Sequence, residues 1–301
     1  MQTRRDVLSG LGAVGVTLTT QPVRASTEIV DALGRRVVLS APPRRIIPIF
    51  ASNTELVVAA GLTDRIVGVE AYTRFPPEIA GLPQIGGRLG FSVDRVVMLR
   101  PDLVIVTPAR QAVHQLVDPL ERLGIPVIVL AHPTIAAVLA NLRLVARAGG
   151  VEADGDSVAR RLEERLATVA ARNASRPRPR ALMITGRVSN GLLLVARPDT
   201  YTADAARAAG TRDALTGPRH LLQVSPEAVL RADPDCVLFA GTEAAMHEVF
   251  DTPAWSGLRA RQGGRLIAVN RAEFLIPGPR VVDGIEKLAT RLGAITWERP
   301  S

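Results

Sequence analysis

The sequence predicts an α/β protein of two Rossmann-like lobes, each with a mostly parallel sheet, joined by one long backbone helix. In both halves of the chain, short apolar runs alternate with helical patterns, which is typical of parallel strands covered by helices on both faces. A long helical pattern, residues 134–172, separates the two halves. In addition, a stretch that starts at Ser92 occurs again from Ser225, once in each half.

The first half of the chain shows strand and helix signals in strict alternation. Apolar runs predict four strands, at residues 44–50, 65–72, 102–107 and 125–130. Helical spacing predicts three helices between them, at residues 53–61, 92–100 and 119–124. Gly61 closes the first helix, and Ser92 is placed to cap the second. We assign residues 26–148 to an N-terminal lobe on this pattern.

The helical pattern in the middle of the chain is interrupted at Gly149-Gly150. Beyond that break, apolar side chains recur every three or four residues and form one stripe along a helix. They are Val158, Leu162, Leu166 and Val169. A helix of about 20 residues spans roughly 30 Å, the width of a small domain. We therefore expect residues 149–176 to link the N-terminal lobe to a C-terminal lobe of residues 177–301.

The second half repeats the alternation. Strands are predicted at residues 181–185, 236–241 and 265–270, and helices at residues 202–210, 225–232 and 279–293. Each copy of the repeated stretch is a helix that leads into a buried strand. Each has an acid two residues after its serine, at Asp94 and Glu227, and a Pro-Asp pair before its strand.

The first 25 residues have the layout of a secretory signal peptide, with a charged start, an apolar middle and a small-residue end. Arg4-Arg5 and the residues after them resemble a twin-arginine export signal. Cleavage after Ala25 would leave Ser26 first, and no cysteine stands there to receive a lipid. We therefore expect an exported, soluble, periplasmic protein without a lipid anchor.

Composition argues against several classes of partner. The net charge of +8 comes from arginines spread along the chain, without the basic block of a nucleic-acid tail. Aromatic residues make up 3%, too few for a base-stacking surface, so no nucleic-acid partner is expected. The single cysteine and four histidines have no spacing typical of a metal site, and we predict neither a metal cluster nor a cofactor.

With these elements in order, the chain resembles the periplasmic binding proteins of iron-siderophore, haem and cobalamin ABC importers. The resemblance covers nearly all of the chain after residue 25 and rests on short motifs in the expected order. They include Asp31-x-x-Gly34-Arg35, Thr54-Glu55, Ser92 to Ile105, Leu123 to Val127, Ser225 to Leu238, Pro253-Ala254-Trp255 and Gly278-Pro279-Arg280. It implies a monomer that binds a metal chelate between its lobes and delivers it to a permease dimer with its ATPase.

The resemblance also implies a docking role for Asp94 and Glu227, because such proteins contact the permease through one acid on each lobe. Both acids lie in the first turn of a predicted helix, where the helix dipole favours a carboxylate. A symmetric receptor needs one acid per lobe, which accounts for the repeat.

Loops at the carboxyl ends of the strands, where α/β lobes bind ligands, carry arginines and tyrosines. The predicted ligand-binding residues are Tyr72, Arg74, Arg88, Arg187, Tyr201 and Arg271. Guanidinium groups suit the carboxylates of haem or of an anionic siderophore, and tyrosine can ligate iron or stack on a macrocycle. Haem-binding relatives tend to have tyrosine where this chain has Phe75, so Tyr72 would have to replace it. Ferric siderophore, haem and cobalamin all stay open.

Two other functions are also open at this point: a two-lobed periplasmic enzyme, or a sensor domain, acting on a small anionic ligand. The enzyme is disfavoured because the chain has no G-x-S-x-G, phosphate-loop or H-E-x-x-H motif, and we predict no catalytic residues. The sensor is disfavoured because no output module follows Trp297.

Overall fold

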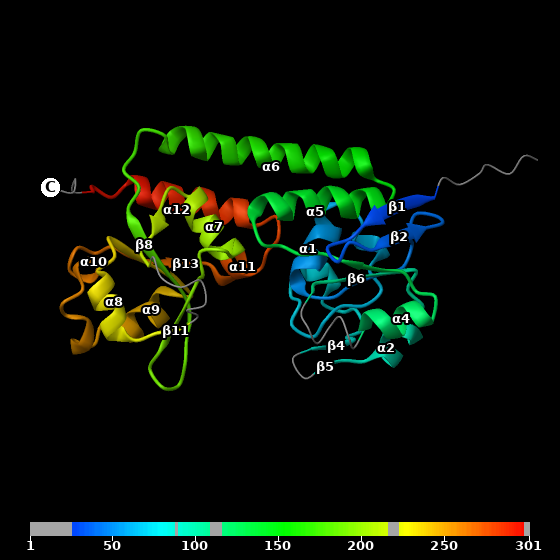
Figure 1. Cartoon of the computed structure of the whole chain (residues 1–301), viewed down its shortest axis with the longest axis horizontal. Helices are drawn as coiled ribbons and strands as arrows, with labels where there is room; N and C mark the ends of the chain where they lie inside the picture. Colours follow the sequence, from blue (N-terminus) through cyan, green and yellow to red (C-terminus); the bar gives the residue numbers. More distant parts are fainter. Residues whose placement is uncertain (1–25, 88–89, 109–115, 216–222, 298–301) are drawn as a thin grey trace, which may run out of the picture.

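Two lobes lie side by side beneath one long helix that spans both of them (Figure 1). The computed structural model describes residues 26–87, 90–108, 116–215 and 223–297. The predicted signal peptide, residues 1–25, and the candidate ligand residue Arg88 lie outside these ranges. Within them, no helix combines the length and the apolar character needed to cross a membrane.

The N-terminal lobe is built on a parallel sheet in the order β3-β6-β7. Its strands are β3 (Ile46–Pro48), β6 (Leu103–Val106) and β7 (Val127–Val129), and every residue in them is buried. The helices are α1 (Ala51–Ala59), α2 (Val93–Met98), α4 (Asp118–Arg122) and α5 (Ile135–Ala148), with 3-10 turns at Thr63–Arg65 and Pro77–Ile79. Two antiparallel pairs complete the lobe: β1 (Thr27–Val30) with β2 (Arg36–Leu39), and β4 (Gly86–Gly87) with β5 (Gly90–Phe91).

The strand predicted at residues 65–72 does not form. Instead, the segment makes single bridges with two different partners. Ile66 pairs with Ile46 of β3, whereas Val69 pairs with Gln84 in a loop. Because the partner changes within three residues, no continuous ladder can form. Ile66 and Val69 are nevertheless buried. The apolar pattern therefore correctly predicted that this segment belongs to the core, but not how its backbone is hydrogen-bonded.

The central helical pattern forms two helices, α5 and α6 (Glu152–Asn173), and the chain turns at Gly149-Gly150 as predicted. Gly150 has a φ of 71°, a left-handed conformation that favours glycine. Leu162 and Val169 of the predicted stripe are buried against the protein. α6 is the long helix that runs along both lobes in Figure 1.

α5 and α6 pack very closely against each other. A Cβ atom at Gly155 of α6 would lie 2.1 Å from the Cβ of Ala146 of α5, so only glycine fits there. Arg143 of α5 pairs with Asp156 and Glu163 of α6, at 2.9 and 2.6 Å. These contacts fix the direction in which α6 leaves the N-terminal lobe.

The C-terminal lobe has a six-stranded mixed sheet along the path β11-β9-β8-β12-β13, with β10 beside β8. The strands are β8 (Arg180–Arg187), β9 (Leu193–Val195), β10 (Arg212–Asp213), β11 (Gln223–Val224), β12 (Cys236–Ala240) and β13 (Leu266–Val269). β8, β12 and β13 are parallel, as predicted. β9 and β11 are antiparallel and were not predicted, because two or three residues are too short to show a period.

Helices of the C-terminal lobe follow the predicted order, with three further short ones. They are α7 (Tyr201–Ala208), α8 (Pro226–Ala232), α9 (Glu243–Phe250), a 3-10 turn at Pro253–Trp255, α10 (Arg259–Gln262), α11 (Arg271–Leu275) and α12 (Val281–Gly293). One apolar core continues from lobe to lobe through α5, α6, α7 and α12, and includes Leu142, Val169, Ala205 and Ile285. The helical layer therefore holds the two lobes together.

The repeated sequence forms the same structure in both lobes. Ser92 and Ser225 cap α2 and α8, and each hydroxyl accepts a backbone N–H bond from three residues on. Residues with left-handed φ end both helices, Arg100 at 46° and Asp233 at 38°.

The Pro-Asp pairs of the repeat also have matching contacts. The Asp102 carboxylate accepts the backbone N–H of Arg45 at 2.9 Å, and that of Asp235 accepts the backbone N–H of Arg180 at 2.7 Å. The side chains of Arg45 and Arg180 in turn donate to carbonyls at the ends of α2 and α8. Each aspartate thus fixes the start of its lobe's first core strand beside the helix that carries the acid.

Candidate ligand-binding cleft

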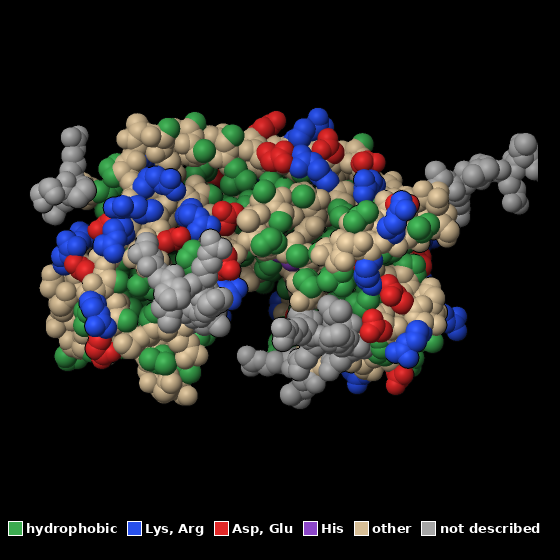
Figure 2. Space-filling model, in the orientation of Figure 1, with side chains coloured by type: hydrophobic (Ala, Val, Ile, Leu, Met, Phe, Trp, Pro, Cys, Tyr) green, Lys and Arg blue, Asp and Glu red, His purple; other side chains and the backbone are tan. Residues whose placement is uncertain are grey.

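Between the lobes, the surface is hollowed into a notch that opens on the side away from α6 (Figure 2). Above the notch, α1 of the N-terminal lobe meets the segment before α12 of the C-terminal lobe, and we call this contact the lobe junction. Its central feature is a run of buried polar residues at the start of α1, Ser52 to Glu55. Such residues are rarely buried without partners, so each needs a structural explanation.

Glu55 and Arg280 form an ion pair across the lobe junction, with 2.5 Å between Oε1 and Nη2. The Glu55 side chain is 2% exposed and that of Arg280 is 25% exposed. Burial raises the pKa of Glu55 above its ordinary value, although the hydrogen bond from Arg280 opposes this shift. The Arg280 guanidinium also stacks over Phe75, 4.1 Å from the ring centroid. One arginine of the C-terminal lobe therefore contacts both α1 and a loop of the other lobe.

A second buried cluster joins the ends of the three N-terminal strands. Asn53 donates to Thr107 Oγ1 at 3.2 Å, and its Oδ1 lies 3.1 Å from His132 Nε2. Asn141 Nδ2 lies 3.0 Å from His132 Nδ1. Since the Asn141 amide donates to Nδ1, the imidazole carries its proton on Nε2 and donates it to Asn53. Burial lowers the pKa of His132 to about 4, so this histidine is a neutral structural residue at pH 7.

Tyr72 and Arg74 lie on the same loop as Phe75, and both are exposed. Tyr72 is 59% exposed, and its ring lies over Gly87, where a Cβ atom would be 2.9 Å from the ring. The Arg74 guanidinium donates to the carbonyl of Ala71 at 2.6 Å, which fixes the side chain against its own loop. This loop brings an aromatic and a cationic side chain to the N-terminal side of the lobe junction.

Arg271 occupies a comparable position on the C-terminal lobe. Its Nη1 donates to the carbonyls of Thr185 in β8 and Ala240 in β12, both at 3.0 Å. The exposed guanidinium is thereby held at the carboxyl ends of two parallel strands, the usual place for a ligand. Arg187 ends β8 and pairs with exposed Glu248 at 3.3 Å. Arg271 is therefore held by two backbone carbonyls, whereas Arg187 pairs with one exposed acid.

Tyr201 is not available to a ligand, and the sequence prediction for it was wrong. Only 4% of the residue is exposed, and its hydroxyl donates to the carbonyls of Glu273 and Ile276, at 2.9 and 2.7 Å. Burial raises the pKa of the hydroxyl, which disfavours the phenolate that would ligate iron. The sequence pattern places Tyr201 in a loop before a helix, whereas in the structure it begins α7 with its side chain in the interior.

Asp94 and Glu227 are both exposed and are the second residues of α2 and α8. Hydrogen bonds from the Ser225 hydroxyl and the backbone lower the pKa of Glu227, so it is ionised at pH 7. In Figure 1, α2 and α8 lie on different lobes, both displaced from α6 toward the open side of the notch. The two acids therefore lie on corresponding helices of different lobes.

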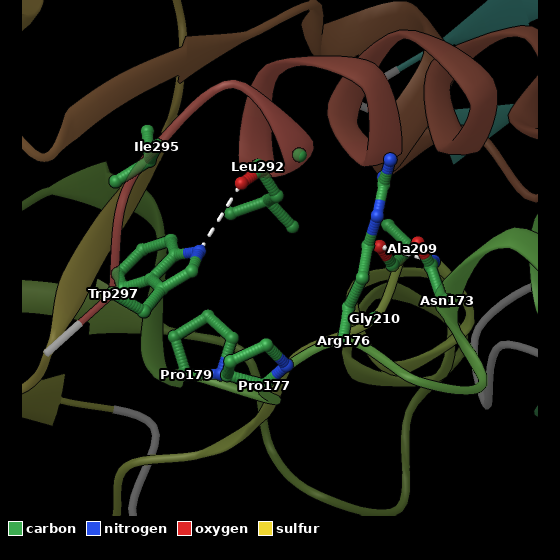
Figure 3. Close-up of a pocket in the computed structure, with 10 residues that line it drawn as sticks. Asn173, Arg176, Pro177, Pro179, Ala209, Gly210, Leu292, Ile295 and Trp297 are labelled. Carbon is green, nitrogen blue, oxygen red and sulfur yellow. Dashed lines mark hydrogen bonds between the residues drawn. The ribbon is translucent and has the colours of Figure 1, made fainter. Parts of the chain in front are cut away.

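Two cavities lie elsewhere. One of about 150 Å³ is found where α6 joins the C-terminal lobe, between Asn173, Arg176 and the end of α12 (Figure 3). Trp297 closes it and donates to the carbonyl of Leu292 at 3.1 Å. The other, about 790 Å³, is an open groove along α12 and β13 that contains the Lys287–Glu273 ion pair. Across the described ranges, no three His, Cys, Asp or Glu side chains are grouped as metal ligands.

Residues 46–272 match the model of a family described as periplasmic binding protein. The chain belongs to this family. Substrate-binding proteins of ABC importers act with a permease and an ATPase.

Several relatives of this periplasmic binding protein align over most of its length. An uncharacterized ABC transporter substrate-binding lipoprotein, YvrC of Bacillus subtilis, is 25% identical over 90% of this chain and 86% of its own. The vitamin B12-binding protein of Photorhabdus laumondii is 26% identical over 84% of this chain and 90% of its own. A periplasmic heme-binding protein from Pseudomonas aeruginosa is 28% identical, with a TM-score of 0.71 over 83% of this chain and 92% of its own.

The lobe junction is not among the sites that the sequence predicts. Thr54-Glu55 and Gly278-Pro279-Arg280 stand out in the sequence only as family motifs, far apart in the chain. The ion pair between Glu55 and Arg280 was invisible because 225 residues separate them. The sequence nevertheless contains a signal for this site. Four polar residues in a row open a helix that continues with apolar residues and ends at Gly61.

Proposed function

We propose that this periplasmic binding protein captures a cobalamin-type metal chelate between its lobes and delivers it to an ABC importer. The observation that carries the proposal is a pair of exposed guanidinium groups, Arg74 on a loop of the N-terminal lobe and Arg271 at the strand ends of the C-terminal lobe. Two cations from opposite sides suit a ligand with several acceptor groups, such as the phosphate and amide groups of a corrinoid. Tyr72 adds an exposed aromatic face for the macrocycle.

Phe75 favours a corrinoid over haem. Its ring stacks on Arg280 and has no atom that could ligate iron. Cobalamin carries its own axial base and needs no protein ligand, whereas haem is usually held by one. Haem stays the second candidate because Tyr72, three residues upstream, is 59% exposed and carries a hydroxyl. The names of the relatives, which include vitamin B12-binding and heme-binding proteins, support both candidates.

A thermal-shift panel with cobalamin, haemin and ferric siderophores tests the ligand. A ligand at about a hundred times its dissociation constant adds roughly 2.7 kcal/mol of stability, which raises Tm by several degrees. We expect cobalamin to raise Tm, and Arg74→Ala and Arg271→Ala to weaken its binding. Arg212→Ala is the matched control, because this arginine is exposed and its side chain donates to the backbone carbonyl of Arg178 in its own lobe. A shift with haemin that Tyr72→Phe abolishes would instead establish haem as the ligand.

Export and docking complete the proposal. We infer that residues 1–25 direct twin-arginine export and that the mature protein is soluble in the periplasm, acts as a monomer without a cofactor, and docks through Asp94 and Glu227. The Bacillus subtilis relative is named a lipoprotein, whereas here the residue after the expected cleavage site is Ser26. Fractionation of cells with and without Arg4-Arg5→Lys-Lys tests the export route.

The double variant Asp94→Arg, Glu227→Arg should abolish uptake and retain ligand affinity. Uptake that survives would disprove the docking assignment.

A further inference from the structure

Exposed apolar side chains follow the proposed docking acid of the N-terminal lobe on its own helix. Met98 is 79% exposed and Val97 is 36% exposed, and both belong to α2. They follow Asp94 by four and three residues, so the three side chains share one face of the helix. Leu123, at the end of the neighbouring α4, is 59% exposed. Single exposed apolar residues are ordinary, but here two share a helix face with a residue that is proposed to meet a partner.

The C-terminal lobe differs at the equivalent positions. In the repeat, Leu230 corresponds to Val97 and Arg231 corresponds to Met98. Leu230 is half-buried and packs against the core of its lobe, whereas Arg231 is exposed. The charge of Arg231 is close enough to Glu227 to help lower the pKa of that acid. The two helices therefore have similar backbones and acids but different neighbouring surfaces.

We propose that the α2 face formed by Asp94, Val97 and Met98 docks onto the permease through a combined contact, in which the carboxylate meets a basic residue and Met98 enters an adjacent apolar recess. α8 docks through charge alone. The inference rests on the proposed function and extends the docking contact beyond the acids. A permease dimer with twofold symmetry presents the same site twice, so the two lobes bind it unequally.

The chemistry of the two contacts differs. A carboxylate at an interface rim mainly steers association, and its contribution weakens as salt screens it. Burial of an unbranched methionine excludes water and is insensitive to salt, and methionine adapts to irregular recesses. Asp94 is one methylene shorter than Glu227, and the apolar contact offsets its shorter reach. The charge that α2 presents to the importer is thus supplemented by an apolar anchor.

The test measures the dissociation constant between the intact mature protein and its cognate permease–ATPase complex in lipid nanodiscs, at low and high salt. Met98→Gln removes the apolar group at similar length and should weaken binding about tenfold at both salt concentrations. Val38→Gln is the matched control, because Val38 is 57% exposed on β2. Asp94→Asn with Glu227→Gln should weaken binding mainly at low salt. Ligand affinity should be unchanged in all variants, and Tm should be unchanged in Met98→Gln and Val38→Gln; the double acid variant loses the stabilisation that its two carboxylates give to the helix N-termini, so its Tm should fall slightly.

The results distinguish the apolar contact through Met98 from the contact through the two acids. If Met98→Gln behaves like Val38→Gln while the double acid variant still weakens docking, the apolar contact is refuted and the docking acids stand. If neither change affects docking, both this inference and the proposed docking assignment fail. Sedimentation of the protein alone tests whether the same surface binds a second copy of the chain. A self-association that Met98→Gln removes, without any effect on the permease, would assign the surface to a second copy of this chain and overturn the inference.

Discussion

Glu55 on α1 and Arg280 beside α12 connect the lobes through one ion pair, and each keeps a second buried polar atom without a partner in the described part of the chain. These atoms are Glu55 Oε2 and Arg280 Nε. Oε2 is pressed against Gly278, where a Cβ atom would lie 2.4 Å away. The ion pair is therefore tightly enclosed. Each of its two charged groups depends on the other for its compensating charge.

Loss of Glu55 should destabilise the protein strongly. Glu55→Ala leaves Arg280 three-quarters buried without its counter-charge, and removal of one partner of a buried pair costs about 3 kcal/mol. Glu28→Ala is the control, since its pair with Arg36 is exposed and worth about 1 kcal/mol or less. Urea denaturation measures both changes. Equal effects of the two substitutions would show that the lobe junction is not held by this ion pair.

The buried histidine predicts a loss of stability in mild acid. The folded pKa of His132 is about 4, below the ordinary value of 6.5, so the unfolded chain takes up the proton first as pH falls. Its contribution to stability is therefore complete above pH 6.5 and declines between 6.5 and about 4. The decline is on the order of 3 kcal/mol. We expect His132→Gln to flatten the pH dependence of the free energy of unfolding in this window, relative to the unchanged protein. Parallel curves would contradict this role.

Tyr201 should affect stability and not ligand binding. Tyr201→Phe removes the hydroxyl that bonds two carbonyls in the C-terminal lobe, which costs about 1–3 kcal/mol. Because the ring stays in the core, the affinity for the chelate should stay within twofold. Tyr72→Phe serves as the comparison at an exposed position. If Tyr201→Phe greatly lowered the affinity for the chelate and left stability unchanged, Tyr201 would be a ligand-binding residue after all.

Close packing at Gly155 predicts that a better helix former will destabilise α6. Gly155→Ala gains about 1 kcal/mol of helix propensity, but its methyl group would clash with Ala146 and force α5 and α6 apart. Overpacking costs about 1–3 kcal/mol, so we expect a lower Tm. The change in stability that comes from helix propensity alone is measured separately with Ala167→Gly, at an exposed site of the same helix. A higher Tm for Gly155→Ala would show that the two helices separate easily.

The sequence by itself located β3, β6, β7, β8, β12 and β13, the long helix and the repeat that the two lobes share, although the strand predicted at residues 65–72 does not form. Periodicity is a local property, so the buried runs at β6 and β12 and the stripe on α6 are visible without knowledge of their neighbours. The repeat was equally readable, because Ser92 and Ser225 act as caps within their own helices.

Only the tertiary structure decided which side chains reach the notch. Tyr201 and Tyr72 look alike in sequence, but one is buried by contacts with α11 and the other is exposed. Glu55 and Arg280 meet only because the tertiary fold brings α1 beside the segment before α12. Such contacts depend on the relative placement of whole elements, and pairing between distant residues leaves no periodic signal in one sequence.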